Sequence, residues 1–164
     1  MSEDPGDRLA RARTAVAAVE DPELPALTIA DLGILRDVTL RDGRVEVTIT
    51  PTYTGCTAMA VIGWEIEAAL DRAGLGPALV RTVLAPAWST DALGPDARAK
   101  LAAAGIAPPP APGAVQGAAP DAAPACPRCA SARTELLSAF GATGCKSLHR
   151  CRDCREPFEA FKAH

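Results

Sequence analysis

Four of the six cysteines in this chain form a repeated pattern that suits metal binding. Two Cys-x-x-Cys pairs stand 21 residues apart near the end of the chain, at Cys126, Cys129, Cys151 and Cys154. Each turn can place two thiolates on one ion, and two facing turns complete a tetrahedron. Because four protein ligands leave no open position, the pattern predicts a structural zinc site. Iron in place of zinc stays open, whereas a dithiol redox pair fits poorly without a redox-domain βαβ context.

Cys56 lies in a different setting, where an alternating apolar stretch gives way to a helical one. Residues 44–50 place apolar side chains at every second position, and after Gly55 an apolar stripe follows at Met59, Ile62, Ile66 and Leu70. A thiol at a helix start ionises more easily, because free backbone N–H groups favour an anion. The thiolate would be both a nucleophile and a metal ligand. The alternative is that Cys56 is a small buried apolar residue, as most free cysteines are.

Cys145 and an acidic loop are further candidates. Cys145 is surplus to a tetrahedral site, and we expect either a packed strand residue or a second exposed, reactive thiol beside Lys146. Asp21 and Glu23 stand two positions apart on a loop that two prolines stiffen. They are a candidate polar site, with a solvated turn as the alternative.

The composition excludes several classes of protein. The 164 residues are 48% hydrophobic and 23% charged, and no apolar run is long enough to cross a bilayer. The beginning of the chain carries acids and no apolar signal core, so we expect a cytoplasmic location. Residues 126–164 carry seven basic and four acidic side chains, an excess too small to indicate nucleic-acid binding. That excess would suit an acidic protein surface equally well.

The helices and strands that must position Cys56 and the acidic loop are expected within residues 1–106. Periodicity predicts an α+β domain, a small mixed sheet with helices packed on one face. The expected helices cover residues 7–19, the stretch from Cys56 to about residue 73, and 96–104. The expected strands cover 34–41, 44–50 and 78–84. Asp42-Gly43 predicts a tight hairpin between the first two strands.

A spacer and a small second unit complete the chain. Residues 107–125 contain eight Ala, six Pro and two Gly, a composition that cannot bury a core and predicts a flexible linker. Residues 126–164 are expected to form a C-terminal four-Cys zinc ribbon with strands at 135–140, 147–150 and 157–161. So short a unit holds little apolar core, so the metal must contribute much of its folding free energy.

Several segments resemble the family of small iron–sulfur assembly factors that includes the bacterial SufT-like proteins. They are the acidic loop Asp21-Pro22-Glu23, the turn Thr28–Gly33 and the stretch Thr50–Cys56. With the loop Trp88–Asp91, the segment Gly105–Pro109 and the ribbon segment Phe140–Lys146, the whole chain resembles the PaaD family. Members of that family are associated with the multicomponent phenylacetyl-CoA epoxidase. One departure is Thr57, which follows Cys56 where the assembly factors commonly have proline.

The resemblance implies an accessory role in aerobic phenylacetate degradation, with no catalytic activity of its own. The chain would help to insert an iron–sulfur cluster or iron into the reductase or oxygenase component, and the iron–sulfur reductase is the expected client. Cys56 matches the transient iron or cluster ligand, Asp21 and Glu23 match the acidic loop, and the four ribbon cysteines match zinc ligands. One thiolate cannot retain a cluster alone, so we expect a homodimer or hand-over at an interface. The tethered ribbon would dock the client.

Two other functions remain open from the sequence. Cys56 could be the nucleophile of a thiol enzyme acting on a CoA thioester, although the sequence pairs no base with it. The chain could instead be a zinc-ribbon adaptor without iron chemistry. We expect neither nucleic acid nor a membrane as a partner.

Overall fold

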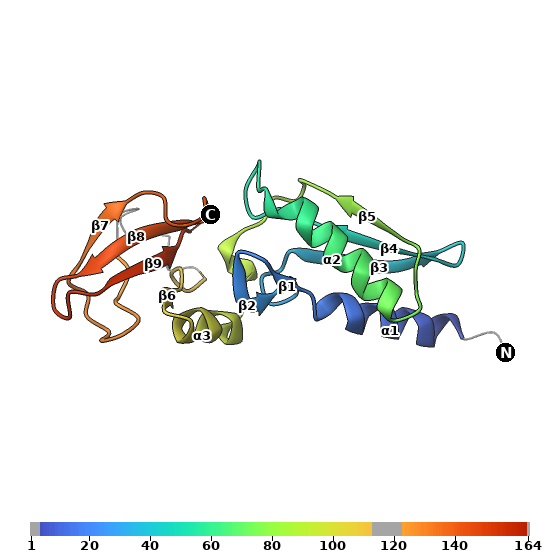
Figure 1. Ribbon diagram of the computed structural model, residues 1–164, viewed down its shortest axis with the longest axis horizontal. Coiled ribbons are helices and arrows are strands. Elements are labelled where there is room, and N and C mark those ends of the chain that lie inside the picture. Colours follow the sequence, from blue (N-terminus) through green and yellow to red (C-terminus); the bar gives the residue numbers. More distant parts are fainter. Residues whose placement is uncertain (1–3, 113–122, 164) are drawn as a thin grey trace. The chain divides into compact units, whose positions relative to one another are not determined.

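The computed structural model describes residues 4–112 and 123–163, and the chain divides into two compact units, Met1–Trp88 and Ser89–His164. Each unit has its own sheet (Figure 1). Among the described residues, no helix combines the length and apolar character needed to span a membrane.

The first unit contains a three-stranded mixed sheet with two helices against it (Figure 1). β3 (Leu35–Arg41) and β4 (Arg44–Ile49) form an antiparallel hairpin, and β5 (Ala78–Thr82) runs parallel to β4. α1 (Pro5–Ala17) packs against β3, α2 (Ala58–Arg72) packs against β5, and the two helices contact each other. This arrangement confirms the predicted α+β class and the mixed sheet.

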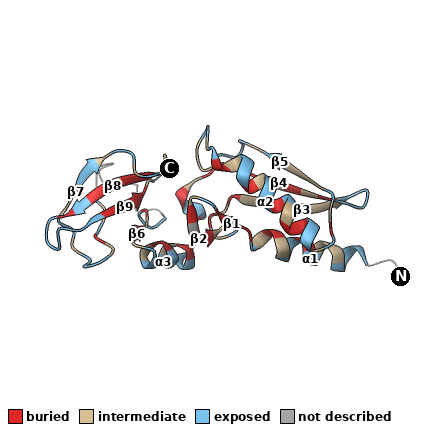
Figure 2. Cartoon of the chain, in the orientation of Figure 1, coloured by how far each residue is buried: buried red, intermediate tan, exposed pale blue. Residues whose placement is uncertain are grey.

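Sequence periodicity explains how these elements form. β4 buries Val45, Val47 and Ile49, and α2 buries Ile62, Ile66 and Leu70, so both apolar stripes lie inside (Figure 2). Asp42 and Gly43 have φ of 51° and 76°, the left-handed values that a two-residue hairpin turn requires. α1 begins two residues earlier than predicted, because the Asp4 side chain accepts from the Gly6 N–H and Pro5 suits the first helical position.

A two-stranded ribbon replaces the loop predicted at residues 21–25. β1 (Glu20–Asp21) pairs antiparallel with β2 (Leu24–Thr28). Pro22 lies in the turn between the two strands, and Pro25 lies in the irregular stretch between the paired positions Leu24 and Thr28. Neither proline therefore has to donate to the ladder. A turn follows β2, in which the Thr28 hydroxyl accepts from the Asp31 N–H at 3.1 Å.

The second unit is built on a four-stranded sheet in the order β6-β9-β8-β7. β7 (Thr134–Ser138), β8 (Lys146–Cys151) and β9 (Pro157–Phe161) are antiparallel and confirm the three predicted ribbon strands. β6 (Ile106–Ala107) adds to β9 in parallel. A short 3₁₀ turn, η1 (Thr90–Ala92), and α3 (Pro95–Ala103) precede β6.

The boundary between the units differs from the one at residue 106 that the sequence suggested. α3 and β6 lie in the second unit, and Ala107, expected in the spacer, is 1% exposed in an apolar cluster with Cys126 and Phe158. Arg98 of α3 also donates to the carbonyl of Pro110, at 2.7 Å. A two-residue strand is too short to show a period, which is why the sequence missed it. Residues 113–122 of the predicted spacer lie outside the described residues.

Candidate metal centre and assembly site

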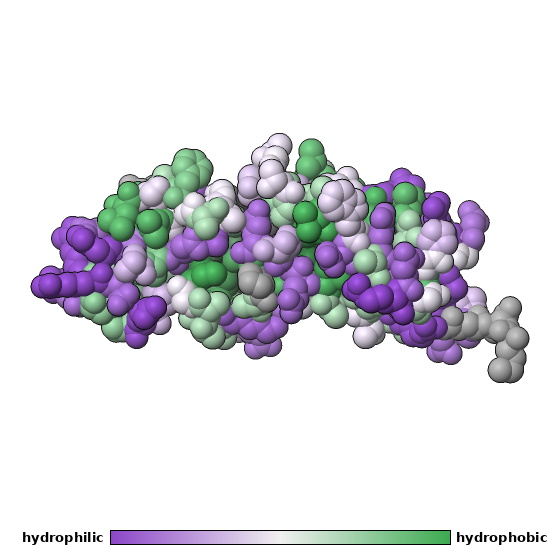
Figure 3. Space-filling model, in the orientation of Figure 1, coloured by the Kyte–Doolittle hydropathy of each residue, from purple (hydrophilic) through white to green (hydrophobic). Residues whose placement is uncertain are grey.

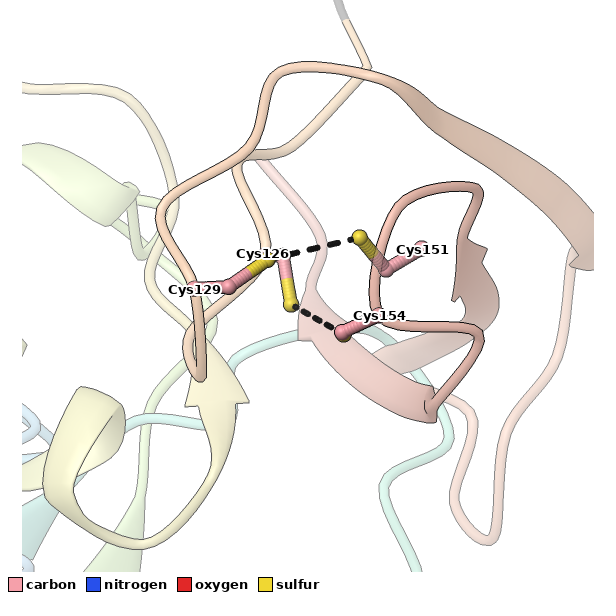
Figure 4. A group of neighbouring side chains, drawn as sticks. All are labelled: Cys126, Cys129, Cys151 and Cys154. Atoms are coloured by element: carbon pink, nitrogen blue, oxygen red, sulfur yellow. Dashed lines mark hydrogen bonds between the residues drawn. The ribbon is translucent and has the colours of Figure 1, made fainter.

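Two knuckles of the second unit bring the four predicted zinc ligands together (Figure 4). Cys126 and Cys129 lie in a turn before β7, whereas Cys151 ends β8 and Cys154 lies in the turn towards β9. The residue after each knuckle has positive φ, 58° at Ala130 and 64° at Arg155. This left-handed residue lets the chain turn sharply after its second cysteine, so both sulfurs of a knuckle point to one centre.

The sulfur positions fit one tetrahedral metal ion. All four Sγ atoms lie within 4.8 Å of one another, with 3.7 Å between Cys126 and Cys154 and 3.5 Å between Cys129 and Cys151. Metal–sulfur bonds of zinc length give a tetrahedron with edges of about 3.8 Å. Cys126 and Cys151 are buried, whereas Cys129 and Cys154 are exposed. The donor set, its spacing and its closed geometry therefore fit zinc, with these four cysteines as its ligands.

The thiols of this cluster do not ionise equally. The backbone N–H of Cys154, helped by that of Asp153, lowers the pKa of the Cys151 thiol to about 6. The backbone N–H of Glu156 favours the Cys154 thiolate, but partial loss of water around the sulfur and the neighbouring thiols outweigh it and raise the pKa of Cys154 to about 12. Four sulfurs this close cannot all become thiolates without a cation between them, so metal binding must displace protons.

Asp153 ties the two knuckles together around the cluster. Its carboxylate, between the ligands of the second knuckle, accepts from the Ser131 hydroxyl and from Arg133 Nη1 at 2.7 Å. Ser131 and Arg133 both follow the first knuckle. Outer contacts of this kind hold ligand loops in place, so Asp153 positions the cluster without being one of its ligands.

Cys56 is half-buried and lies just before α2. Its N–H donates to the Tyr53 carbonyl at 3.3 Å, and Gly55 before it has φ of 91°. Thr57 is the N-cap of α2 and makes no side-chain capping bond. The predicted strand–turn–helix setting of Cys56 is thus present, and its thiol is not sealed in the apolar core.

Asp21 closes the turn between β1 and β2. Its Oδ1 accepts from the Glu23 N–H at 2.8 Å and from the Leu24 N–H at 3.0 Å. The Asp21 side chain is buried, at 6% exposure, whereas Glu23 is half-buried. Asp21 therefore stabilises the acidic loop in addition to any role in binding.

A pocket of about 450 Å³ opens beside this loop in the first unit. Asp21 lines it, whereas Glu23 and Cys56 do not, so it brings together only one of the three residues predicted for iron or cluster transfer. The complete lining comes from α1, the β1 region and α2: Ala15, Ala18, Val19, Glu20, Asp21, Pro22, Val61, Glu65, Ala69 and Arg72.

The remaining candidate thiol is not accessible. Cys145 is 3% exposed and lies 3.1 Å from the Thr143 hydroxyl, so the expectation of an exposed reactive thiol is not met. The sequence also did not anticipate that His149 is buried, which lowers its pKa. His149 stacks on Phe158 and pairs with the Ser147 hydroxyl at 2.9 Å, contacts that only the sheet register reveals.

Both units of the chain match known protein families. Residues 9–84 match the family described as iron–sulfur cluster assembly protein, and residues 110–162 match the PaaD zinc beta ribbon domain. The chain is 44% identical over 147 residues to a putative 1,2-phenylacetyl-CoA epoxidase subunit of Escherichia coli (strain K12). That alignment covers 90% of this chain and 88% of the relative. The chain belongs to the PaaD family.

The PaaD-family chain also shares its fold with a solved domain. A domain of unknown function, DUF59, from Bacillus anthracis matches 59% of this chain and 93% of its own length, with 26% identity and a TM-score of 0.53. The resemblance inferred from the acidic loop, the Cys56 stretch and the ribbon is confirmed at the level of the family. The chemical roles of Cys56, Asp21 and Glu23 stay predictions.

Proposed function

We propose that this chain is an accessory maturation subunit of a phenylacetyl-CoA epoxidase system. Its first unit would deliver an iron–sulfur cluster or iron to another component, with the iron–sulfur reductase as the client. The observation that carries the proposal is the 44% identity to a putative epoxidase subunit across 90% of the chain. The match of residues 9–84 to iron–sulfur cluster assembly proteins supports the chemistry.

Cys56 would be the ligand that holds the cargo during delivery. Its side chain is half-buried just before α2, where a client could reach it. A single thiolate needs further ligands to hold a cluster. We therefore expect the client or a second copy of the chain to supply them, so that the cargo stays labile and can be handed over.

The acidic loop would assist in receiving the incoming iron. Asp21 is fixed by two backbone N–H groups, and such preorganisation suits a carboxylate that must receive a cation without rearrangement. Glu23 follows on the same turn and is more exposed. Both would act on the incoming iron and not on the epoxidase substrate.

The second unit would be a zinc-stabilised docking module. Its four cysteines form a closed set, so zinc there would supply folding free energy and no chemistry. A docked module raises the local concentration of the tethered first unit at the client.

A co-production experiment tests this proposal. The reductase component is produced with and without the full-length chain under iron limitation, and its iron and acid-labile sulfide are measured per polypeptide. We expect a higher cluster content when the chain is present. Equal content in both cases would overturn the maturation role.

The thiol-enzyme alternative gains no support. Among the described residues the histidine, His149, belongs to the other unit, and Cys56 does not line the pocket beside the acidic loop. A nucleophilic cysteine needs an adjacent base and room for its substrate.

A further inference from the structure

β7 forms an unusual edge of the sheet in the second unit. It has β8 on one side, and among the described residues no strand pairs with its other side. Proteins usually protect such an edge with charged residues or proline, because an open edge invites another strand. β7 instead presents Leu136 and Leu137, which are 59% and 49% exposed. Figure 3 shows apolar surface over this end of the unit.

The backbone of β7 offers hydrogen-bonding groups on the open side. The Arg152 N–H donates to the Arg133 carbonyl at 2.8 Å, so Arg133 and Glu135 face β8 in the alternating antiparallel ladder. The N–H and C=O of Leu136, next to Glu135, therefore point away from β8. An added extended segment could pair with them without disturbing the regular part of the ladder, which ends at the register shift between Leu136 and Ser138.

A fixed aromatic side chain extends the apolar edge. Phe140 is 68% exposed and follows β7 in a loop that the body of the unit holds in place. The Glu159 carboxylate accepts from the Ala142 N–H at 2.6 Å, and the Gly141 N–H donates to the Lys146 carbonyl at 2.7 Å. Phe140 is thus presented by an anchored loop, as an interface anchor would be.

The charges around this edge favour an acidic occupant. Arg150 and Arg152 both pair with the single carboxylate of Glu135, and Lys162 lies 4.0 Å from the centre of the Phe140 ring. Two arginines therefore share one carboxylate, and Lys162 adds a positive charge beside the Phe140 ring. A second copy of the chain would bring two such surpluses together, which disfavours self-pairing, whereas an acidic strand would neutralise the excess.

We propose that the open edge of β7, with Leu136, Leu137 and Phe140, binds an extended polypeptide segment of another protein in which apolar and acidic side chains alternate. The segment adds a fifth strand beside β7. Side chains alternate along a strand, so Leu136 lies on the face opposite Glu135 and Arg150. The apolar side chains of the segment would cover Leu136 on one face, and its carboxylates would meet Arg150 and Arg152 on the other. This extends the docking role proposed for the second unit, and its test contains no cluster transfer, so either proposal can fail without the other.

The probe is a fluorescein-labelled octapeptide of alternating valine and glutamate, added to the zinc-loaded full-length chain. We expect saturable binding and slower hydrogen exchange at the Leu136 amide, because that N–H becomes bonded. The same peptide with lysine in place of glutamate should bind at least about tenfold more weakly, because its charge opposes the surplus.

Leu136→Pro is the sharpest variant, because it removes an outward N–H that the β7–β8 ladder does not use. We expect at least about tenfold weaker peptide binding with unchanged zinc content. Leu84→Ser is the matched control, since Leu84 is 64% exposed but lies in the other unit.

Three results would each overturn the proposal: equal binding of the acidic and basic peptides, an unchanged Leu136 amide at saturation, or full binding by Leu136→Pro. Protection of the Leu136 amide without peptide, rising with protein concentration, would show that a second copy occupies the edge and would equally overturn it.

Discussion

Lys146 Nζ lies 2.8 Å from Glu159 Oε2, and the Lys146 side chain is only 6% exposed. The pair joins β8 to β9 in the second unit, and the same glutamate holds the loop that carries Phe140 through the Ala142 N–H. A buried ammonium without its carboxylate is costly. This contact therefore links the stability of the ribbon to the geometry of its proposed docking edge.

Replacing the carboxylate tests that link. Glu159→Gln should destabilise the second unit by about 3 kcal/mol, because it leaves the Lys146 charge buried and unpaired. Hydrogen exchange at the β8 amides of the zinc-loaded chain measures this loss. Lys146→Met combined with Glu159→Gln should recover most of it, and no recovery in the double variant would show that the cost lies elsewhere.

The same pair predicts a pH dependence. Burial opposes ionisation of Glu159, but the Lys146 ammonium and the Ala142 N–H outweigh it and lower the pKa of the carboxyl. A lowered folded-state pKa stabilises the fold above the ordinary glutamate value and loses that contribution as the pH falls through the folded value. The stability gap between wild type and Glu159→Gln, measured in excess zinc, should thus stay constant from neutral pH to about pH 4.3. A gap that closes near neutral pH would contradict this assignment.

Metal removal should affect the two units differently. Structural zinc contributes on the order of 10 kcal/mol to folding at neutral pH, so a strong chelator should unfold residues 126–164. The tryptophans, Trp64 and Trp88, both lie in the first unit, so their fluorescence should barely change. Amide exchange at β8 should meanwhile become fast. Cys151→Ser should reproduce this without chelator, and retained protection in that variant would argue against a metal-dependent ribbon.

Two substitutions of Asp21 separate its role in the turn from its proposed role in iron transfer. Asp21→Ala removes an acceptor of two backbone N–H groups and should destabilise the first unit by about 2 kcal/mol. Asp21→Asn keeps an acceptor oxygen and should cost less than about 1 kcal/mol by tryptophan-monitored urea unfolding. If the charge serves iron transfer, the Asn variant should still lose reductase loading. Normal loading by a stable Asn variant would reduce Asp21 to a turn residue.

Local signals in the sequence predicted the features that depend on neighbouring residues. The Cys-x-x-Cys spacing located the four candidate metal ligands because each knuckle is a four-residue turn. Asp42-Gly43 located the hairpin because few residues accept its backbone angles. Cys56 was placed correctly between strand and helix, because the change from a two-residue to a helical apolar period is visible in the residues on either side of it. The features missed depend on partners far along the chain. Ala107 joins β9, and neither segment carries a sign of the other.

The sequence also could not predict which charged residues are buried and paired. Lys146 and Glu159 look like ordinary surface positions in the sequence, and only the pairing of β8 with β9 shows that they meet. The pocket beside Asp21 likewise arises where α1, α2 and the β1 region come together, and no periodicity specifies it. Both depend on tertiary packing rather than on local propensity.

Cluster loading by a cysteine variant tests the central claim most directly. The reductase is co-produced with the wild-type chain, with Cys56→Ser or with Cys145→Ala, whose thiol is buried and outside the zinc set. Iron and acid-labile sulfide are then measured per reductase polypeptide. We predict that Cys56→Ser falls to the level seen without the chain, whereas Cys145→Ala matches wild type. Full loading with Cys56→Ser would contradict the account.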